Sequence, residues 1–142
     1  MKSRLQQLVA VQEPRDSIVA AYAFGSCLRD DFKDRSDIDL AFLVPHAAYR
    51  EDPLKAIAPA HILAAEIGLA LDRETDVTIL NSASLEMAFE IISHGECIYE
   101  SDAEERIQHE LKVKGMYHDF KPFIDELRSK RLKGLTSHRG RA

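Results

Sequence analysis

The sequence predicts a single domain of mixed α/β or α+β class, on three observations. Two apolar runs, residues 17–24 and 36–45, have the length of buried strands, and a β-branched run follows at residues 75–80. Helical patterns lie between and after these strands, at residues 53–71, 82–95 and 102–131. With 142 residues, the chain is long enough to bury one core without disulfide bridges.

The first third of the chain is predicted to open with a helix. Apolar residues recur at helical spacing from Leu5 to Val9, and Pro14 ends that pattern. The first strand run is apolar throughout and stops at Gly25, which is typical of a strand buried on both faces. Residues 27–36 are polar and predict a short helix and loop before the second strand.

The central segments carry clear start and stop signals. The helix predicted at 53–71 is mainly Ala, Leu and Ile, and Pro59 predicts a bend within it. The helix over 82–95 begins near a serine that can cap it and ends at Gly95. Residues 96–101 predict a short fourth strand.

The C-terminal part is predicted to be one long helix, about 102–131, followed by a frayed basic tail at 132–142. An apolar stripe runs along this helix. Within it, an aromatic cluster has two open interpretations: it packs the helix onto the sheet, or it forms a docking surface for a partner protein. The cluster comprises Met116, Tyr117, Phe120 and Phe123.

Composition excludes several classes of protein. The net charge of −5 disfavours direct binding to a nucleic-acid backbone. The two cysteines have no metal-ligand spacing and are expected to be reduced thiols. The N-terminus lacks the apolar region of a signal peptide, and no apolar stretch is expected to reach the length of a membrane span. We therefore expect a cytoplasmic protein with no membrane partner.

Two carboxylates interrupt the second strand. Because side chains alternate along a strand, Asp37 and Asp39 share one face while Ile38 and Leu40 point to the other. Two such charges about 5 Å apart repel by roughly 3 kcal/mol at an effective dielectric of about 20. A divalent cation such as Mg²⁺ would offset that repulsion. The alternative, a polar face simply open to water, stays open on these two residues alone.

Asp76 interrupts the third strand in the same way, with Val77 and Ile79 on the opposite face. If the strand at 75–80 lies beside 36–45, three carboxylates converge on one patch. Such a triad can hold metal ions and bind or deprotonate an attacking hydroxyl, as phosphoryl transfer requires.

The Gly25-Ser26 pair ends the first strand where a helix could begin. Glycine permits a tight turn and a close approach of the backbone to a ligand. Free backbone N–H groups around Ser26 would bind an anion, and Arg29 could add charge-assisted hydrogen bonds. Phosphate is the anion that such a site is expected to bind.

Together, "FGSCLRDDFKDRSDIDLAFLV" and "TDVTIL" resemble the nucleotidyltransferase core of the DNA polymerase β superfamily, in its minimal nucleotidyltransferase (MNT) form. The likeness spans about residues 18–99. It implies a small mixed β-sheet flanked by helices, with ATP as co-substrate and Mg²⁺ as cofactor. The resemblance departs from the family pattern at Asp30 and Asp31, where a small residue is expected after the arginine.

The resemblance also implies the role of each site residue. Gly25 and Ser26 would hold the terminal phosphates of the nucleotide, and Arg29 matches an arginine that members of the family often carry. Asp37 and Asp39 would ligate Mg²⁺. Asp76 would complete the metal site and help to activate the acceptor, so all three aspartates are predicted to be catalytic.

The whole layout resembles the antitoxin half of HEPN–MNT toxin–antitoxin pairs. That resemblance implies a protein adenylyltransferase that moves AMP from ATP to a tyrosine of a HEPN-type RNase toxin, with which it could form a hetero-oligomer. Two alternatives remain open: transfer to a small-molecule hydroxyl, and a non-catalytic antitoxin that acts by binding alone. The absence of an added acceptor domain counts against the first, and the complete set of site residues against the second.

The remaining reactive side chains favour ordinary roles. The six histidines show no pair at a zinc-binding spacing, and His118 is the most plausible exception, through a partner contact. Cys27 stands beside Ser26 with no histidine nearby in sequence to act as a base, which favours packing over nucleophilic catalysis.

Overall fold

The computed structural model describes residues 1–25 and 36–140, without the side chains of residues 15 and 134–140. Four strands form one sheet in the order β3-β2-β1-β4. β1 (Ala20–Phe24) pairs antiparallel with both β2 (Ile38–Leu43) and β4 (Glu96–Glu100), whereas β2 and β3 (Thr75–Ile79) pair in parallel. The mixed sheet predicted from the sequence is therefore confirmed.

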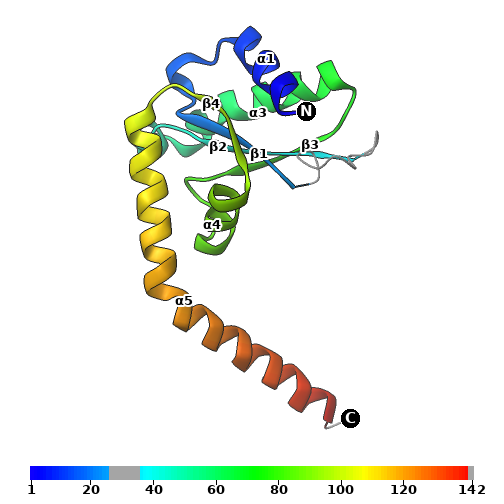
Figure 1. Cartoon of the computed structure of the whole chain (residues 1–142), viewed down its shortest axis with the longest axis vertical. Helices are drawn as coiled ribbons and strands as arrows, with labels where there is room; N and C mark the ends of the chain where they lie inside the picture. Colours follow the sequence, from blue (N-terminus) through cyan, green and yellow to red (C-terminus); the bar gives the residue numbers. More distant parts are fainter. Residues whose placement is uncertain (26–35, 141–142) are drawn as a thin grey trace.

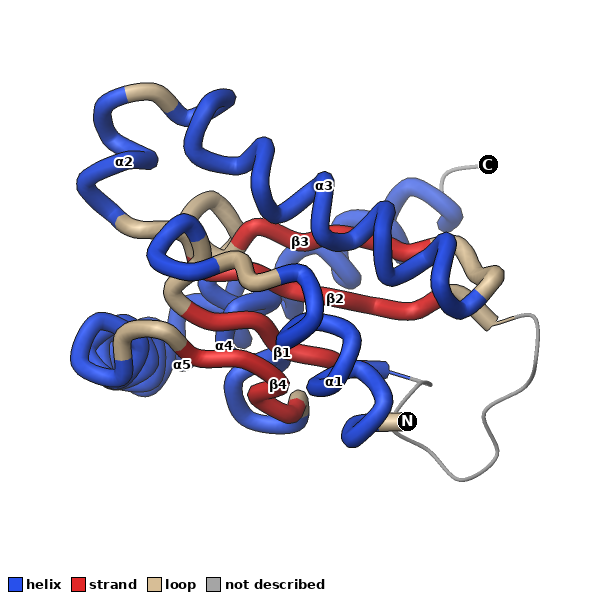
Figure 2. Tube along the Cα trace, turned by 90° about the horizontal axis from the view of Figure 1, so that it is seen from above, coloured by secondary structure: helices blue, strands red, loops and turns tan. Residues whose placement is uncertain are grey.

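Helices cover both faces of this sheet (Figures 1 and 2). On one face, α1 (Lys2–Gln12) and α3 (Pro53–Leu71) enclose a core that includes Phe42 and Ile67. On the other, α4 (Leu85–His94) and α5 (Ala103–Gly140) pack over a second apolar cluster that includes Ile91. Short helical turns at η1 (Arg15–Ser17) and α2 (His46–Glu51) complete the elements.

The alternation predicted for β2 is present in the structure. Ile38, Leu40 and Phe42 belong to the core beneath α1 and α3, whereas Ala41 and Leu43 face α4 and α5. All six residues of β2 are buried except Asp39, which is half-buried at the start of the strand. The strand is thus apolar on both faces and polar only at this end.

The predicted α3 helix continues through Pro59, and the bend predicted at this proline stays a prediction. Two other segments differ from the sequence-based expectations. The α2 helix was not predicted, although Pro45 directly precedes it. The α5 helix continues to Gly140, so the predicted frayed tail at 132–142 is helical through residue 140.

Among the described residues, α3 alone has the length and apolar composition of a membrane-spanning helix. The expectation that no stretch reaches this limit is therefore wrong. The cause is visible in the packing: Leu63 and Ile67 lie in the core against the sheet, while Leu54, Ile62 and Leu69 are exposed on the outer face. Apolar residues on both faces raise the mean hydropathy of the whole helix.

A charged network anchors the first half of α5 to the sheet. The hydroxyl of Tyr22, on β1, donates to Glu110 Oε1 over 2.6 Å, and Arg106 Nη1 donates to the same oxygen over 2.8 Å. Arg106 also pairs with Glu100 at the end of β4. Burial and the Glu110 carboxylate raise the pKa of Tyr22, so its hydroxyl keeps its proton and remains a donor.

The second half of α5 extends away from the domain (Figure 1). Tyr117 still packs against α4, since its ring stacks on Phe89 with centroids 3.7 Å apart. Figure 1 shows a change of direction along α5, and Pro122 lies inside this helix. A proline inside a helix removes a backbone hydrogen bond and favours a bend.

Candidate active site

The parallel pairing of β2 and β3 brings two of the predicted site residues together. In this register Asp39 lies directly opposite Asp76, and Leu40 lies opposite Val77. Both carboxylates are on the sheet face that α4 and α5 cover, at the end of the sheet where β2 begins. The adjacency on which the predicted carboxylate triad depends is therefore present in the structure.

Asp37 lies immediately before β2 and is exposed to solvent. It contributes to the local electrostatics of Asp39: burial, the charges of Asp76 and Asp37, and a hydrogen bond with Asp76 all raise the pKa of Asp39. As the side chains stand, no three His, Cys, Asp or Glu residues among those described are gathered closely enough to hold a metal ion. The three aspartates are neighbours, but in this arrangement their side chains do not converge on a single metal position.

Gly25 ends β1 against this carboxylate cluster. β1 and β2 pair so that Phe24 lies opposite Asp39, and the next residue, Gly25, has a left-handed φ of +73°. A Cβ atom at this position would lie 2.5 Å from Asp39 Oδ2. Only glycine combines this backbone conformation with this close approach. The structure thus brings the Gly25 backbone close to the Asp39 carboxylate, and the predicted role of Gly25 toward the nucleotide phosphates stays a prediction.

Ser26 and Arg29, predicted to hold the nucleotide phosphates, lie outside the described residues, and so do Cys27, Asp30 and Asp31. Their roles stay predictions.

Asn81 is a structural residue that sequence reasoning missed. Its side-chain Oδ1 accepts from the Val44 N–H over 3.0 Å, and its Nδ2 donates to the Val44 carbonyl over 2.9 Å. These two bonds connect the segment after β3 to the end of β2. An asparagine directly after a strand was the available signal, but its partner is 37 residues away in sequence.

A mixed four-stranded sheet, with aspartates on neighbouring strands beside a strand-ending glycine, defines a nucleotidyltransferase fold. The family model described as "Polymerase beta, Nucleotidyltransferase" matches residues 6–104. The chain therefore belongs to the polymerase β nucleotidyltransferase family. No curated protein sequence matches the chain at a significant level.

Several solved structures share this fold. A chain of the complex of a tri-AMPylated Shewanella oneidensis HEPN toxin with an MNT antitoxin is 20% identical, with a TM-score of 0.57 over 90% of this chain and 99% of that one. A chain of a toxin–antitoxin structure with AMP-PNP is 21% identical, with a TM-score of 0.58 over 89% and 98%. A chain of the toxin–antitoxin pair MntA–HepT is 21% identical, with a TM-score of 0.53 over 89% and 96%.

The contact between Gly25 and Asp39 predicts that Gly25→Ala is destabilising. Left-handed φ costs an L-residue about 1–2 kcal/mol, and the added Cβ must also displace the Asp39 carboxylate. We expect a loss of about 2 kcal/mol in the free energy of unfolding, measured by urea denaturation. Gly115→Ala is the matched control, since a Cβ there meets nothing within 4 Å. In the helix α5 it should stabilise by about 0.5–1 kcal/mol. Equal effects of the two substitutions would contradict this account.

The raised pKa of Asp39 predicts a pH-dependent loss of stability in metal-free protein. Because the folded state binds the Asp39 proton more tightly than the unfolded state, stability is highest below the unfolded pKa of about 3.9 and falls as pH rises through the folded value. Asp39→Asn should remove this component. At pH 7 in EDTA it should raise the free energy of unfolding by up to about 1 kcal/mol, because solvent screens the half-buried carboxylate.

The measurement is urea denaturation of both proteins from pH 4 to pH 7. A lower unfolding midpoint for Asp39→Asn at pH 7 would show that the carboxylate is stabilising rather than repelled. Added Mg²⁺ should then stabilise the wild type more than the variant, since a ligand that binds only the folded state raises stability.

Proposed function

We propose that this protein is a Mg²⁺-dependent adenylyltransferase that transfers AMP from ATP to a tyrosine hydroxyl of a HEPN-type toxin and thereby acts as its antitoxin. The observation that carries the proposal is the β2–β3 register, which sets Asp39 beside Asp76 at the end of the sheet where Gly25 leaves β1. The likeness in fold to an MNT antitoxin bound to a tri-AMPylated toxin supports the choice of acceptor.

The donor set fits a magnesium ion. Asp37, Asp39 and Asp76 offer only hard carboxylate oxygens, which Mg²⁺ prefers over softer ligands. Burial is the largest cause of the raised pKa of Asp39, and the charges of Asp76 and Asp37 add to it; a divalent cation would offset this repulsion. When bound, the ion would supply electrostatic stabilisation of charge on the phosphate oxygens.

The chemistry needs positioning rather than a covalent enzyme intermediate. The tyrosine oxygen of the partner attacks the α-phosphorus of ATP, the bond to the β-phosphate oxygen breaks, and pyrophosphate leaves. The hydroxyl proton passes to a carboxylate, for which we propose Asp76, and then to water. Asp76 suits this role because the β2–β3 register sets it directly opposite Asp39, beside the carboxylates proposed to hold the metal ion.

The exposed side of α5 favours a protein acceptor over a small molecule. Tyr117 packs against Phe89, but Phe120, Phe123 and Leu127 are exposed on the part of the helix that extends from the domain. The aromatic cluster predicted from the sequence thus divides between the two interpretations, packing for Tyr117 and exposure for its neighbours. Exposed aromatic anchors of this kind are typical of protein interfaces.

AMP transfer can be tested by intact mass. We expect a HEPN-type partner, sought among the proteins encoded beside this chain, to gain one or more AMP units after incubation with ATP and Mg²⁺. The double variant Asp37→Ala, Asp39→Ala should slow the transfer a hundredfold or more, on the order of the loss of key electrostatic groups in other enzymes. Asp16→Asn, an exposed aspartate before β1, is the control and should leave the transfer unchanged.

The possible outcomes separate the candidate functions. If the partner stays unmodified but still co-purifies tightly, the result favours neutralisation by binding over AMP transfer. No modification and no binding would overturn the proposal as a whole.

The docking surface can be tested by co-purification with the same partner. The double variant Phe120→Ser, Phe123→Ser should weaken the complex by about tenfold or more, because truncation of buried aromatic anchors costs more than 1 kcal/mol each. Leu69→Ser removes an exposed apolar side chain from α3 on the opposite side of the sheet and should have no effect. A weaker complex with Leu69→Ser alone would place the interface on α3 instead.

A further inference from the structure

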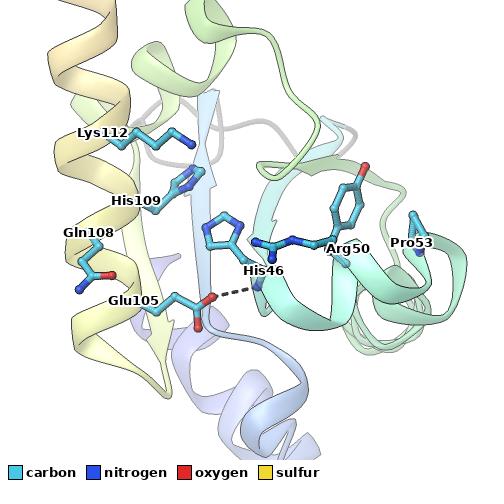
Figure 3. Close-up of a pocket in the computed structure, with 8 residues that line it drawn as sticks. His46, Arg50, Pro53, Glu105, Gln108, His109 and Lys112 are labelled. Carbon is cyan, nitrogen blue, oxygen red and sulfur yellow. Dashed lines mark hydrogen bonds between the residues drawn. The ribbon is translucent and has the colours of Figure 1, made fainter.

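A polar pocket lies at the opposite end of the sheet from the aspartates. It is formed by α2, which follows β2, and by the first half of α5, and its volume is about 600 Å³ (Figure 3). From Asp39 to Val44 the strand spans about 16 Å, at roughly 3.3 Å per residue. The pocket is therefore separate from the candidate active site.

A buried histidine in this pocket has no hydrogen-bond partner. His109, on α5, is only 9% exposed, and both of its ring nitrogens lack a partner. Burial, followed by the electrostatic effects of the neighbouring His46 and Lys112, lowers the pKa of His109 to about 4, so the ring is neutral at pH 7. It therefore carries one N–H donor and one acceptor. A buried polar group is expected to be paired, so these two unpaired nitrogens are available to a hydrogen-bonding ligand.

His46 is held beside His109 in a defined orientation. The two rings lie 5.3 Å apart between centroids, and the His46 backbone N–H donates to Glu105 Oε1 over 2.9 Å (Figure 3). Asn81 Nδ2 lies 3.3 Å from His46 Nδ1. The bonds of Asn81 to Val44 fix which end of its amide is the nitrogen, so Nδ1 of a neutral His46 accepts. The proton of that ring is then on Nε2, as a second donor.

Two permanent cations complete the lining. Lys112 extends beside His109 and Arg50 extends toward His46 (Figure 3). Among the residues that the structure describes, neither cation forms an ion pair. Glu105 is the one carboxylate in the lining, and it already accepts the backbone N–H of His46. The pocket thus has a positive balance and an excess of hydrogen-bond donors.

We propose that this pocket binds the phosphate group of a small molecule. A guanidinium offers two parallel N–H donors that match phosphate oxygens, and an ammonium adds a point charge. The imidazole N–H groups of His46 and His109 supply the remaining donors. A metal ion is a poorer guest, because two cations line the pocket and no three ligating side chains are gathered within the described part of the chain. The volume leaves room for a mononucleotide-sized ester beyond the phosphate itself.

Phosphate binding can be measured from the imidazole signals of His109 and His46 by NMR. The full-length protein is titrated in EDTA with inorganic phosphate and, separately, with AMP, against potassium chloride at the same ionic strength. EDTA removes any metal-dependent binding at the aspartates, so the result does not depend on nucleotidyl transfer. We expect saturable shifts of both signals with phosphate or AMP and none with chloride.

Matched lysine variants locate the site. Lys112→Gln should weaken the binding by about tenfold or more, the effect of losing one charge-assisted hydrogen bond. Lys114→Gln removes an exposed lysine of the same helix that does not line the pocket, and should bind like the wild type. Tighter binding of AMP than of phosphate would show that the rest of the nucleotide also contacts the pocket. Shifts that do not saturate, or equal affinities for both lysine variants, would overturn the proposal.

Discussion

The parallel pairing of β2 with β3 is the constraint on which the rest of the structure depends. It places Asp39 opposite Asp76 and, one residue on, Leu40 opposite Val77, so the same register fixes both the carboxylate pair and the core. Because side chains alternate with a period of two, a slip of one residue would move the aspartates into the core beneath α1 and α3 and the leucine and valine out of that core. The burial of the apolar face therefore maintains two like charges side by side.

The antiparallel pairing of β1 with β2 adds the second condition at this end of the sheet. It sets Phe24 opposite Asp39, so the chain leaves β1 directly over the carboxylate. Gly25 adopts its left-handed conformation at the same point where the backbone comes close to Asp39 Oδ2. A side chain there would meet a charged group that is itself held by the β2–β3 register. The glycine and the aspartates are thus coupled by geometry as well as by chemistry.

Sequence reasoning predicted the parts of this arrangement that have a local signal. The period-two alternation predicted the faces of Asp39 and Asp76, and the apolar runs predicted the four strands. The adjacency of the second and third strands could be stated only as a condition, since no single segment of the sequence encodes the order of the strands in a sheet. The end of α5 was misjudged because the segment contains Gly134 and Gly140, which have low helix propensity, and yet it is helical through residue 140.

The polar pocket around His46 and His109 shows more clearly what sequence reasoning cannot predict. His46 and His109 lie 63 residues apart and share no motif, so each histidine was expected to have an ordinary role. What joins them is long-range: Asn81 orients one ring, and the packing of α5 buries the other. His118, the histidine singled out from the sequence, lies edge-on to Phe89, and its predicted partner contact stays a prediction. Long-range contacts of this kind are visible only in the folded chain.

The helix α5 carries residues of both the phosphate pocket and the exposed aromatic surface. Its first half is fixed to the sheet by the Tyr22–Glu110–Arg106 network and lines the phosphate pocket. Farther along, Tyr117 stacks on Phe89, and the exposed ion pair of Arg128 with Glu86 contributes little. Stability is therefore concentrated in the first half, and the extended half carries exposed aromatic residues at little cost to the fold. A partner can engage that half without disturbing the register that sets Asp39 beside Asp76.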